Sequence, residues 1–208
     1  MRRIDAVAGQ EFNQFVENIP AWSGWLATLV SNEDGLIVGQ DGSSKGIGNQ
    51  VDLQLLMALR SKADVICTTG RTARAESYKA SRFAPLAFLT KSRESLSEIP
   101  AVIEPGSHAN IFIEPRAGID PFNWANKELN NMGFTSILFE GGPSSLEDLW
   151  LVNLPIQLVF SIADCKDSEN VDVLEILELA LPWLKSPELV DDLVIGSNRV
   201  TRWIKSPL

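Results

Sequence analysis

Short apolar runs bounded by polar or glycine-rich residues recur along the chain and predict the strands of a sheet. The run Ile137–Phe139, closed by the polar Glu140, has the length and composition of a buried central strand. By the same criteria we expect strands at Trp22–Ser31, Ala63–Thr68, Leu86–Thr90, Ile111–Glu114, Gln157–Ile162, Leu193–Ile195 and Arg199–Lys205.

Helical periodicity and helix start signals fall between these strands. Asn49 can cap a helix over Val51–Arg60, and Asp120–Pro121 is the cap-plus-proline signature of a helix over Phe122–Met132. Further helices are expected from about Thr72, after the turn at Gly141–Gly142, and over Val171–Leu181. The alternation over residues 51–150 predicts a largely parallel α/β sheet, and the strand-rich C-terminal part adds antiparallel edge strands.

The stretch Thr135–Trp150 predicts a strand, a diglycine turn and a helix in succession. Gly141–Gly142 lets the backbone turn tightly and leaves space for a ligand, and Pro143 suits the first helical turn. Ser144 and Glu147 have capping-box spacing, so helix amides would point back over the turn, where they favour a phosphate. A strand–helix connection without a ligand is the alternative interpretation.

Polar or glycine-rich residues follow several strands and should meet in one crevice, because ligands of α/β sheets bind beyond the carboxyl ends of the strands. These strand ends are Asp34–Gly35, Thr69–Thr72, Thr90–Arg93 and Glu140–Pro143. Their arginines and lysine favour a polyanionic ligand, although solvated surface charges are the alternative. Asp34 and Glu140 could form an acid–base pair, or could serve as partners of a helix or a turn.

Composition narrows the function classes. A net charge of −9 opposes binding to nucleic acid and to anionic membranes. Hydrophobic residues make up 45% of the chain, enough for a sizeable core, and nothing resembles a linker, so we expect a single domain over residues 1–208. Residues 1–12 lack the apolar run of a secretory signal and no stretch approaches a membrane span, which favours a cytoplasmic protein.

The motifs of several common kinds of site are missing from the sequence. The single histidine, His108, and the absence of metal-ligand spacing exclude zinc chemistry. The glycine-rich run at residues 42–48 does not closely follow a strand, so it does not match the GxGxxG dinucleotide fingerprint. No nucleophile elbow accompanies His108, which excludes a hydrolase triad.

Two segments resemble a known family. Ala63–Tyr78, ADVICTTGRTARAESY, and Ile137–Pro143, ILFEGGP, resemble the reductase domain of riboflavin biosynthesis, which is the C-terminal half of the bifunctional deaminase–reductase. Ser31–Gly35 resembles it more weakly, and the likeness extends over most of Trp25–Lys205. The resemblance implies an α/β fold of the dihydrofolate-reductase-like type, with a mixed, mostly parallel sheet flanked by helices.

The same resemblance implies an NADPH-dependent reductase, a homodimer, whose small-molecule substrate is a phosphorylated ribosylamino-pyrimidine. It assigns cofactor contacts to Gly70, Thr72, Thr90, Ser92, Arg93, Gly141, Gly142 and Pro143. It makes Asp34 and Glu140 the catalytic residues, and it gives substrate contacts to Asp34, Ser44 and Arg82. The alternatives are a reductase for a pterin-like substrate, and a degenerate paralogue that keeps the fold and nucleotide affinity without turnover.

The chain departs from the family pattern at two turns. Residues 32–35 read NEDG where the family reads SLDG, which puts a charge at an apolar position. Residues 69–72 read TGRT where the family reads GxGT, so Arg71 replaces a glycine of the cofactor turn. Arg71 either clamps a phosphate or fills the space that the cofactor needs.

Overall fold

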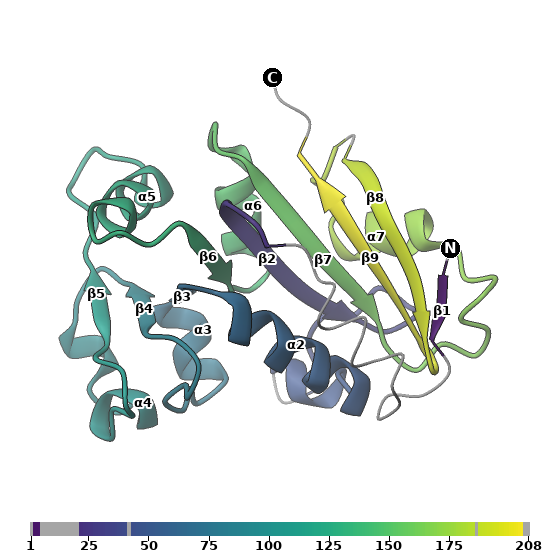
Figure 1. Cartoon of the computed structure of the whole chain (residues 1–208), viewed down its shortest axis with the longest axis horizontal. Helices are drawn as coiled ribbons and strands as arrows, with labels where there is room; N and C mark the ends of the chain where they lie inside the picture. The colour runs from purple at the N-terminus through teal and green to yellow at the C-terminus, as the bar shows by residue number, and fades with distance from the viewer. Residues whose placement is uncertain (1, 5–20, 41–42, 186, 206–208) are drawn as a thin grey trace.

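A mixed sheet organises the computed structural model, which describes residues 2–4, 21–40, 43–185 and 187–205 (Figure 1). Within these residues nine strands run in the order β1-β8-β9-β7-β2-β6-β3-β4-β5. The strands are β1 Arg2–Ile4, β2 Gly24–Ser31, β3 Val65–Thr69, β4 Leu86–Leu89, β5 Ile111–Ile113, β6 Ser136–Phe139, β7 Ile156–Ile162, β8 Glu188–Ile195 and β9 Asn198–Ile204. The predicted N-terminal segment and glycine-rich run lie partly outside the described residues.

The pairing of the strands confirms the mixed, mostly parallel sheet. The strands from β7 through β2, β6, β3 and β4 to β5 are all parallel to their neighbours. Only β9 is antiparallel, to β7 on one side and to β8 on the other, and β1 pairs with β8 in parallel. The strand-rich C-terminal part thus adds the expected antiparallel pairing through β9, but the edge strand of the sheet is β1, beyond β8.

Helices lie between the parallel strands as the alternation predicts. They are α2 Gln50–Lys62, α3 Gly70–Ala75, α4 Pro100–Ile103, α5 Pro121–Asn131, α6 Pro143–Leu151 and α7 Val173–Ala180, with 3-10 turns η1 Ser44–Gly46 and η2 Glu94–Leu96. Asn49 caps α2 as predicted, because its side-chain oxygen accepts hydrogen bonds from the amides of Val51 and Asp52.

Two helices begin earlier than the sequence predicts. Helix α6 begins at Pro143 with Gly142 as its N-cap, so the predicted cap at Ser144 is wrong. Proline fits the first helical position because its fixed φ suits a helix and its missing amide costs no bond there, which puts Ser144 inside the helix. Helix α3 begins at Gly70 rather than near Thr72, because the hydroxyl of Thr69 accepts from the amide of Thr72 and caps it.

The core has two layers, one on each face of the sheet. Alternate residues of a strand point to opposite faces, so Trp25 and Ala27 of β2 join one layer while Leu26 joins the other. The first layer contains buried residues of α5, α6 and α7, and the second contains those of α2, α3 and α4. With both faces covered, the carboxyl ends of the central strands are left for a site.

Candidate active site

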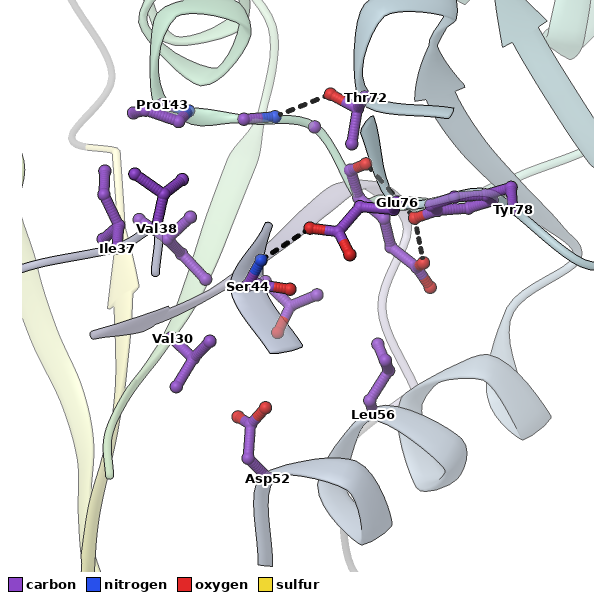
Figure 2. Close-up of a pocket in the computed structure, with 15 residues that line it drawn as sticks. Val30, Ile37, Val38, Ser44, Asp52, Leu56, Thr72, Glu76, Tyr78 and Pro143 are labelled. Atoms are coloured by element: carbon purple, nitrogen blue, oxygen red, sulfur yellow. Dashed lines mark hydrogen bonds between the residues drawn. The ribbon is translucent and has the colours of Figure 1, made fainter. Parts of the chain in front are cut away.

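A cavity lies at the carboxyl ends of β2 and β6, where α2, the end of α3, η1 and the start of α6 meet (Figure 2). It encloses about 130 Å³, with Val30, Ile37 and Val38 on an apolar wall and Asp52, Glu76 and Glu140 supplying carboxyl groups. A larger cavity of about 740 Å³ shares these three carboxyl residues in its wall and extends over α2. Of the four strand ends expected to converge, Thr72 and Glu140–Pro143 lie in this crevice, whereas Asp34–Gly35 and Thr90–Arg93 line neither cavity.

Glu140, the last residue before the diglycine turn, is tightly held. Its carboxylate makes two hydrogen bonds with the guanidinium of Arg60, Nε to Oε1 at 2.7 Å and Nη2 to Oε2 at 2.6 Å. The hydroxyl of Tyr78 donates to the same Oε2 at 2.6 Å. The Glu140 side chain is only 6% exposed, so this is a buried ion pair reinforced by a neutral donor.

The surroundings of Glu140 shift the pKa values of Arg60 and Tyr78, which both donate to its carboxylate. Burial lowers the pKa of Arg60, but the hydrogen bond and the charge of Glu140 raise it further, so the net shift is upward and the guanidinium stays charged. Burial and the charge of Glu140 raise the pKa of Tyr78 well above its ordinary value. Tyr78 is thus a neutral phenol that donates a hydrogen bond to the carboxylate of Glu140.

The two glycines after Glu140 have different reasons to be glycine. A Cβ on Gly141 would lie 2.1 Å from Cζ of Phe139, so the packing of the strand forbids any side chain there. A Cβ on Gly142 would meet nothing closer than the hydroxyl of Thr72 at 3.8 Å, and this residue lines the cavity. The open space at Gly142 lets a ligand approach the backbone.

The start of α6 offers donors beside that open space. The amide of Gly142 donates to Oγ1 of Thr72 at 3.1 Å, which ties the starts of α6 and α3 together. No side chain caps α6, and the amides of Ser144 and Ser145 have no acceptor within the helix by their position. These residues fit a diphosphate, because helix amides and a hydroxyl bind anions without needing a basic side chain.

Asp52 is a site residue that the sequence analysis missed. It lies in the first turn of α2 and lines both cavities. Burial raises its pKa from 3.8 to about 6, and a hydrogen bond with the side chain of Ser161 opposes part of that shift. An acidic residue in a first helical turn is common on protein surfaces, so the sequence carries no signal of this burial.

The expected substrate residues do not all meet in the crevice. Ser44 lines both cavities and its amide donates to Oε1 of Glu76 at 2.7 Å. Asp34 lies exposed in the turn after β2, where its amide donates to Oδ1 of Asn32, and it does not line either cavity. Arg82 is exposed and its guanidinium stacks on Phe83 at 4.7 Å, also outside both cavities.

The expected cofactor residues after β4 form a surface cluster of their own. Thr90 is buried and its hydroxyl donates to the carbonyl of Ser92 at 2.9 Å. The hydroxyl of Ser92 donates to Glu94 at 2.5 Å, and the guanidinium of Arg93 stacks on Phe112 at 4.2 Å. Thr90 also lies against α3, because a Cβ on Gly70 would approach its Oγ1 to 3.2 Å. This cluster adjoins the start of α3.

Solved structures that are similar to this chain include reductases. The chain is similar to a pyrimidine reductase-like protein from Corynebacterium diphtheriae, at a TM-score of 0.62 and 17% identity over 91% of this chain and 96% of that one. It is similar to the Thermotoga maritima diaminohydroxyphosphoribosylaminopyrimidine deaminase/5-amino-6-(5-phosphoribosylamino)uracil reductase, at a TM-score of 0.56 and 13% identity. That match covers 86% of this chain but only 55% of the bifunctional chain.

A third similar structure is a dihydrofolate reductase. Schistosoma mansoni dihydrofolate reductase matches at a TM-score of 0.52 and 12% identity, over 86% of this chain and 96% of that one. The chain therefore has the dihydrofolate-reductase-like fold of the riboflavin-biosynthesis reductases, which confirms the expected fold. No protein-family model and no curated protein matches the sequence.

Two structural features, a membrane-spanning helix and a cluster of metal ligands, are absent from the described residues. Among the helices described, none has both the length and the apolar character that a membrane crossing requires. The same residues contain no group of three or more histidine, cysteine or acidic side chains placed to hold a metal ion.

Proposed function

We propose that this protein is an NADPH-dependent reductase that transfers hydride to a carbon–nitrogen double bond of a small molecule, with a phosphorylated ribosylamino-pyrimidine as the expected substrate. The observation that carries the proposal is the open backbone at Gly142, which faces the same cavity as Asp52 and Glu76. Gly142 would hold the cofactor in the same cavity that these carboxyl groups line. The hydride chemistry belongs to the cofactor, and the protein supplies its placement.

The diphosphate of the cofactor is assigned to the start of α6. Gly142 gives it room, and the amides of Ser144 and Ser145 and the hydroxyl of Thr72 give it donors. Each charge-assisted hydrogen bond of this kind contributes about 1.5–3 kcal/mol. Pro143 lines the cavity at the same place and lacks an amide that would need a partner.

The additional phosphate that distinguishes NADPH from NADH is assigned to the turn after β4. Lys91 and Arg93 are exposed there and can supply positive charge. Ser92 can donate to the phosphate once its hydroxyl leaves Glu94. The carboxylate of Glu94 competes for the same donors, so selectivity for NADPH depends on the two cations.

Proton handling is assigned to Asp52. It lies in the wall shared by the two cavities, and burial raises its pKa to about 6, close to the pH at which a general acid works well. Asp34 and Arg82 lie outside both cavities, and their roles in catalysis and substrate binding stay predictions.

A nucleotide-binding paralogue without turnover is the second candidate. It is favoured by Glu140, because all the hydrogen bonds of its carboxylate go to Arg60 and Tyr78 rather than towards a substrate. The two candidates differ in one assay. The reductase oxidises NADPH when the pyrimidine substrate is added, whereas the paralogue binds NADPH and leaves it unchanged.

The test of the proposal is a fluorescence titration with NADPH and with NADH. We expect NADPH to bind more tightly, and we expect Gly142→Val to weaken NADPH binding by at least about tenfold, the equivalent of losing one charge-assisted hydrogen bond. The control is Asp148→Ala, an exposed change on the same helix outside both cavities. Unchanged binding in a folded Gly142→Val protein would assign the diglycine to the turn alone.

The other expectations stay predictions. They are a single domain over residues 1–208, a homodimer and a cytoplasmic location. Size-exclusion chromatography with light scattering measures the oligomeric state directly.

A further inference from the structure

Every polar atom of Glu140 has a partner within the protein. Its amide donates to the carbonyl of Cys67 at 2.9 Å, and its carbonyl accepts from Oγ1 of Thr68 at 2.7 Å. Its carboxylate accepts from Arg60 at both oxygens and from Tyr78 at Oε2. A residue fixed at its backbone and at both carboxylate oxygens has little freedom to turn towards a ligand.

Exchange of a proton would disturb this arrangement. A proton on the carboxyl group of Glu140 would leave the Arg60 guanidinium, whose side chain is only 17% exposed, without its counter-charge. Loss of one partner of a buried ion pair is strongly destabilising, because the other charge is left uncompensated. Removing the charge of Glu140 would therefore destabilise the arrangement around Arg60.

The three side chains come from three separate elements that meet at the turn. Arg60 lies in the last turn of α2, Tyr78 follows α3, and Glu140 follows β6 directly before Gly141–Gly142. All three side chains line the larger cavity, and Tyr78, Glu140 and Gly142 line the smaller one. The network thus connects the wall of one cavity to the backbone of the other.

We propose that Arg60, Tyr78 and Glu140 are positioning residues, which hold the turn that begins α6 so that its amides are aimed at the cofactor. The role assigned to the turn rests on the proposed function. The ring of Phe139 also excludes any side chain at Gly141, which requires glycine at that position of the turn. Glu140 then acts through the backbone that follows it and exchanges no proton with the substrate.

Conservative variants test the proposal. Tyr78→Phe keeps the ring and the Arg60–Glu140 pair but removes one donor, and we expect NADPH to bind about three- to tenfold more weakly. Glu140→Gln keeps the shape but removes the charge, and we expect a loss of about ten- to a hundredfold. The matched control is Asp192→Asn, which breaks another partly buried pair, with Arg199, on β8 and β9 away from the cavities.

A second measurement needs no cofactor. Hydrogen–deuterium exchange of residues 141–146 should rise in Tyr78→Phe and in Glu140→Gln, and it should stay at the wild-type level in Asp192→Asn. A merely structural role would lower the melting temperature of all three variants without selective exposure of this segment. Unchanged exchange of the segment in a folded Glu140→Gln protein overturns the proposal.

The pH dependence of turnover separates positioning from catalysis. If Glu140 only positions the turn, Glu140→Gln raises the KM for NADPH and leaves the shape of the pH profile intact. If Glu140 exchanges a proton, the same variant loses kcat and one limb of the profile, which overturns the proposal. A wild-type protein that binds no NADPH refutes the proposed function, whereas the exchange measurement still decides whether these residues hold the turn.

Discussion

Asp52→Asn should stabilise the protein at neutral pH and have little effect in acid. Asp52 carries a pKa raised from 3.8 to about 6 by burial in the wall of the two cavities. A raised pKa means that the folded protein holds this proton more tightly than the unfolded chain does. Below pH 3.8 the carboxyl group is protonated in both states, so it makes no pH-dependent contribution there.

The sign of the effect follows from the order in which the two states titrate. As the pH rises from 3.8 towards 6, the unfolded chain loses the proton first, and the free energy of unfolding falls. Above pH 6 both states are ionised and the penalty is constant. A shift of about two pKa units corresponds to an upper limit of about 3 kcal/mol, since each unit is about 1.4 kcal/mol.

The expected gain is smaller than this limit. Asp52 is partly exposed, and its carboxylate interacts favourably with the start of α2, an interaction of about 0.3–1 kcal/mol that asparagine loses. We therefore expect Asp52→Asn to raise the free energy of unfolding by about 1–2 kcal/mol at pH 8. For a chain of this size that corresponds to roughly 2–8 °C in melting temperature.

The assay is urea unfolding of both proteins at intervals from pH 4 to pH 8. The difference between them should be small at pH 4 and should grow to its full value above pH 6. Glu175→Gln is the control, because Glu175 is an exposed carboxylate in the first turn of α7. A difference that does not depend on pH would refute the burial argument, and so would a Glu175→Gln curve with the same rise.

Three further substitutions test other parts of the structure. Gly141→Ala should destabilise the fold by about 1–3 kcal/mol in chemical unfolding, because its Cβ overlaps the ring of Phe139. Arg71→Gly should leave NADPH binding unchanged or weaken it, because Arg71 is exposed and lines neither cavity; a clear gain of affinity in the titration would show that it blocks the site. Replacing Lys91 and Arg93 by alanine should reduce the preference for NADPH over NADH about tenfold or more in parallel titrations, and an unchanged ratio would remove them from the site.

The strands and their order of appearance could be predicted because their signal is local. A buried parallel strand is a continuous apolar run, and β3, β4, β6 and β7 are such runs. β8 is longer than predicted, because it begins at Glu188 with exposed and charged residues that have no apolar pattern. The antiparallel partner β9, rather than its own composition, makes that segment a strand.

The sequence could predict only those parts of the site whose position follows from the order of the strands and helices. Parallel strands place their carboxyl ends on one edge, so the convergence of Thr72 and Gly142 follows from the order of elements. The partners of Glu140 could not be found in this way. Arg60 is 80 residues away in the chain and Tyr78 is 62 residues away, and neither spacing has a sequence signature.

Asp52 and Glu140 show why residue type alone does not assign a catalytic role. Both are carboxyl groups in the wall shared by the two cavities, yet their partners differ in charge. Glu140 faces a guanidinium and a phenol, and both donate hydrogen bonds to its carboxylate. Asp52 is partly buried and its carboxyl group pairs with a neutral hydroxyl, so its ionisation costs free energy. Asp52 therefore keeps its proton up to about pH 6. Neighbouring carboxyl groups in opposite environments divide the tasks of holding charge and moving protons. Under the proposed function, Glu140 would hold the turn through its pair with Arg60, and Asp52 would move the proton.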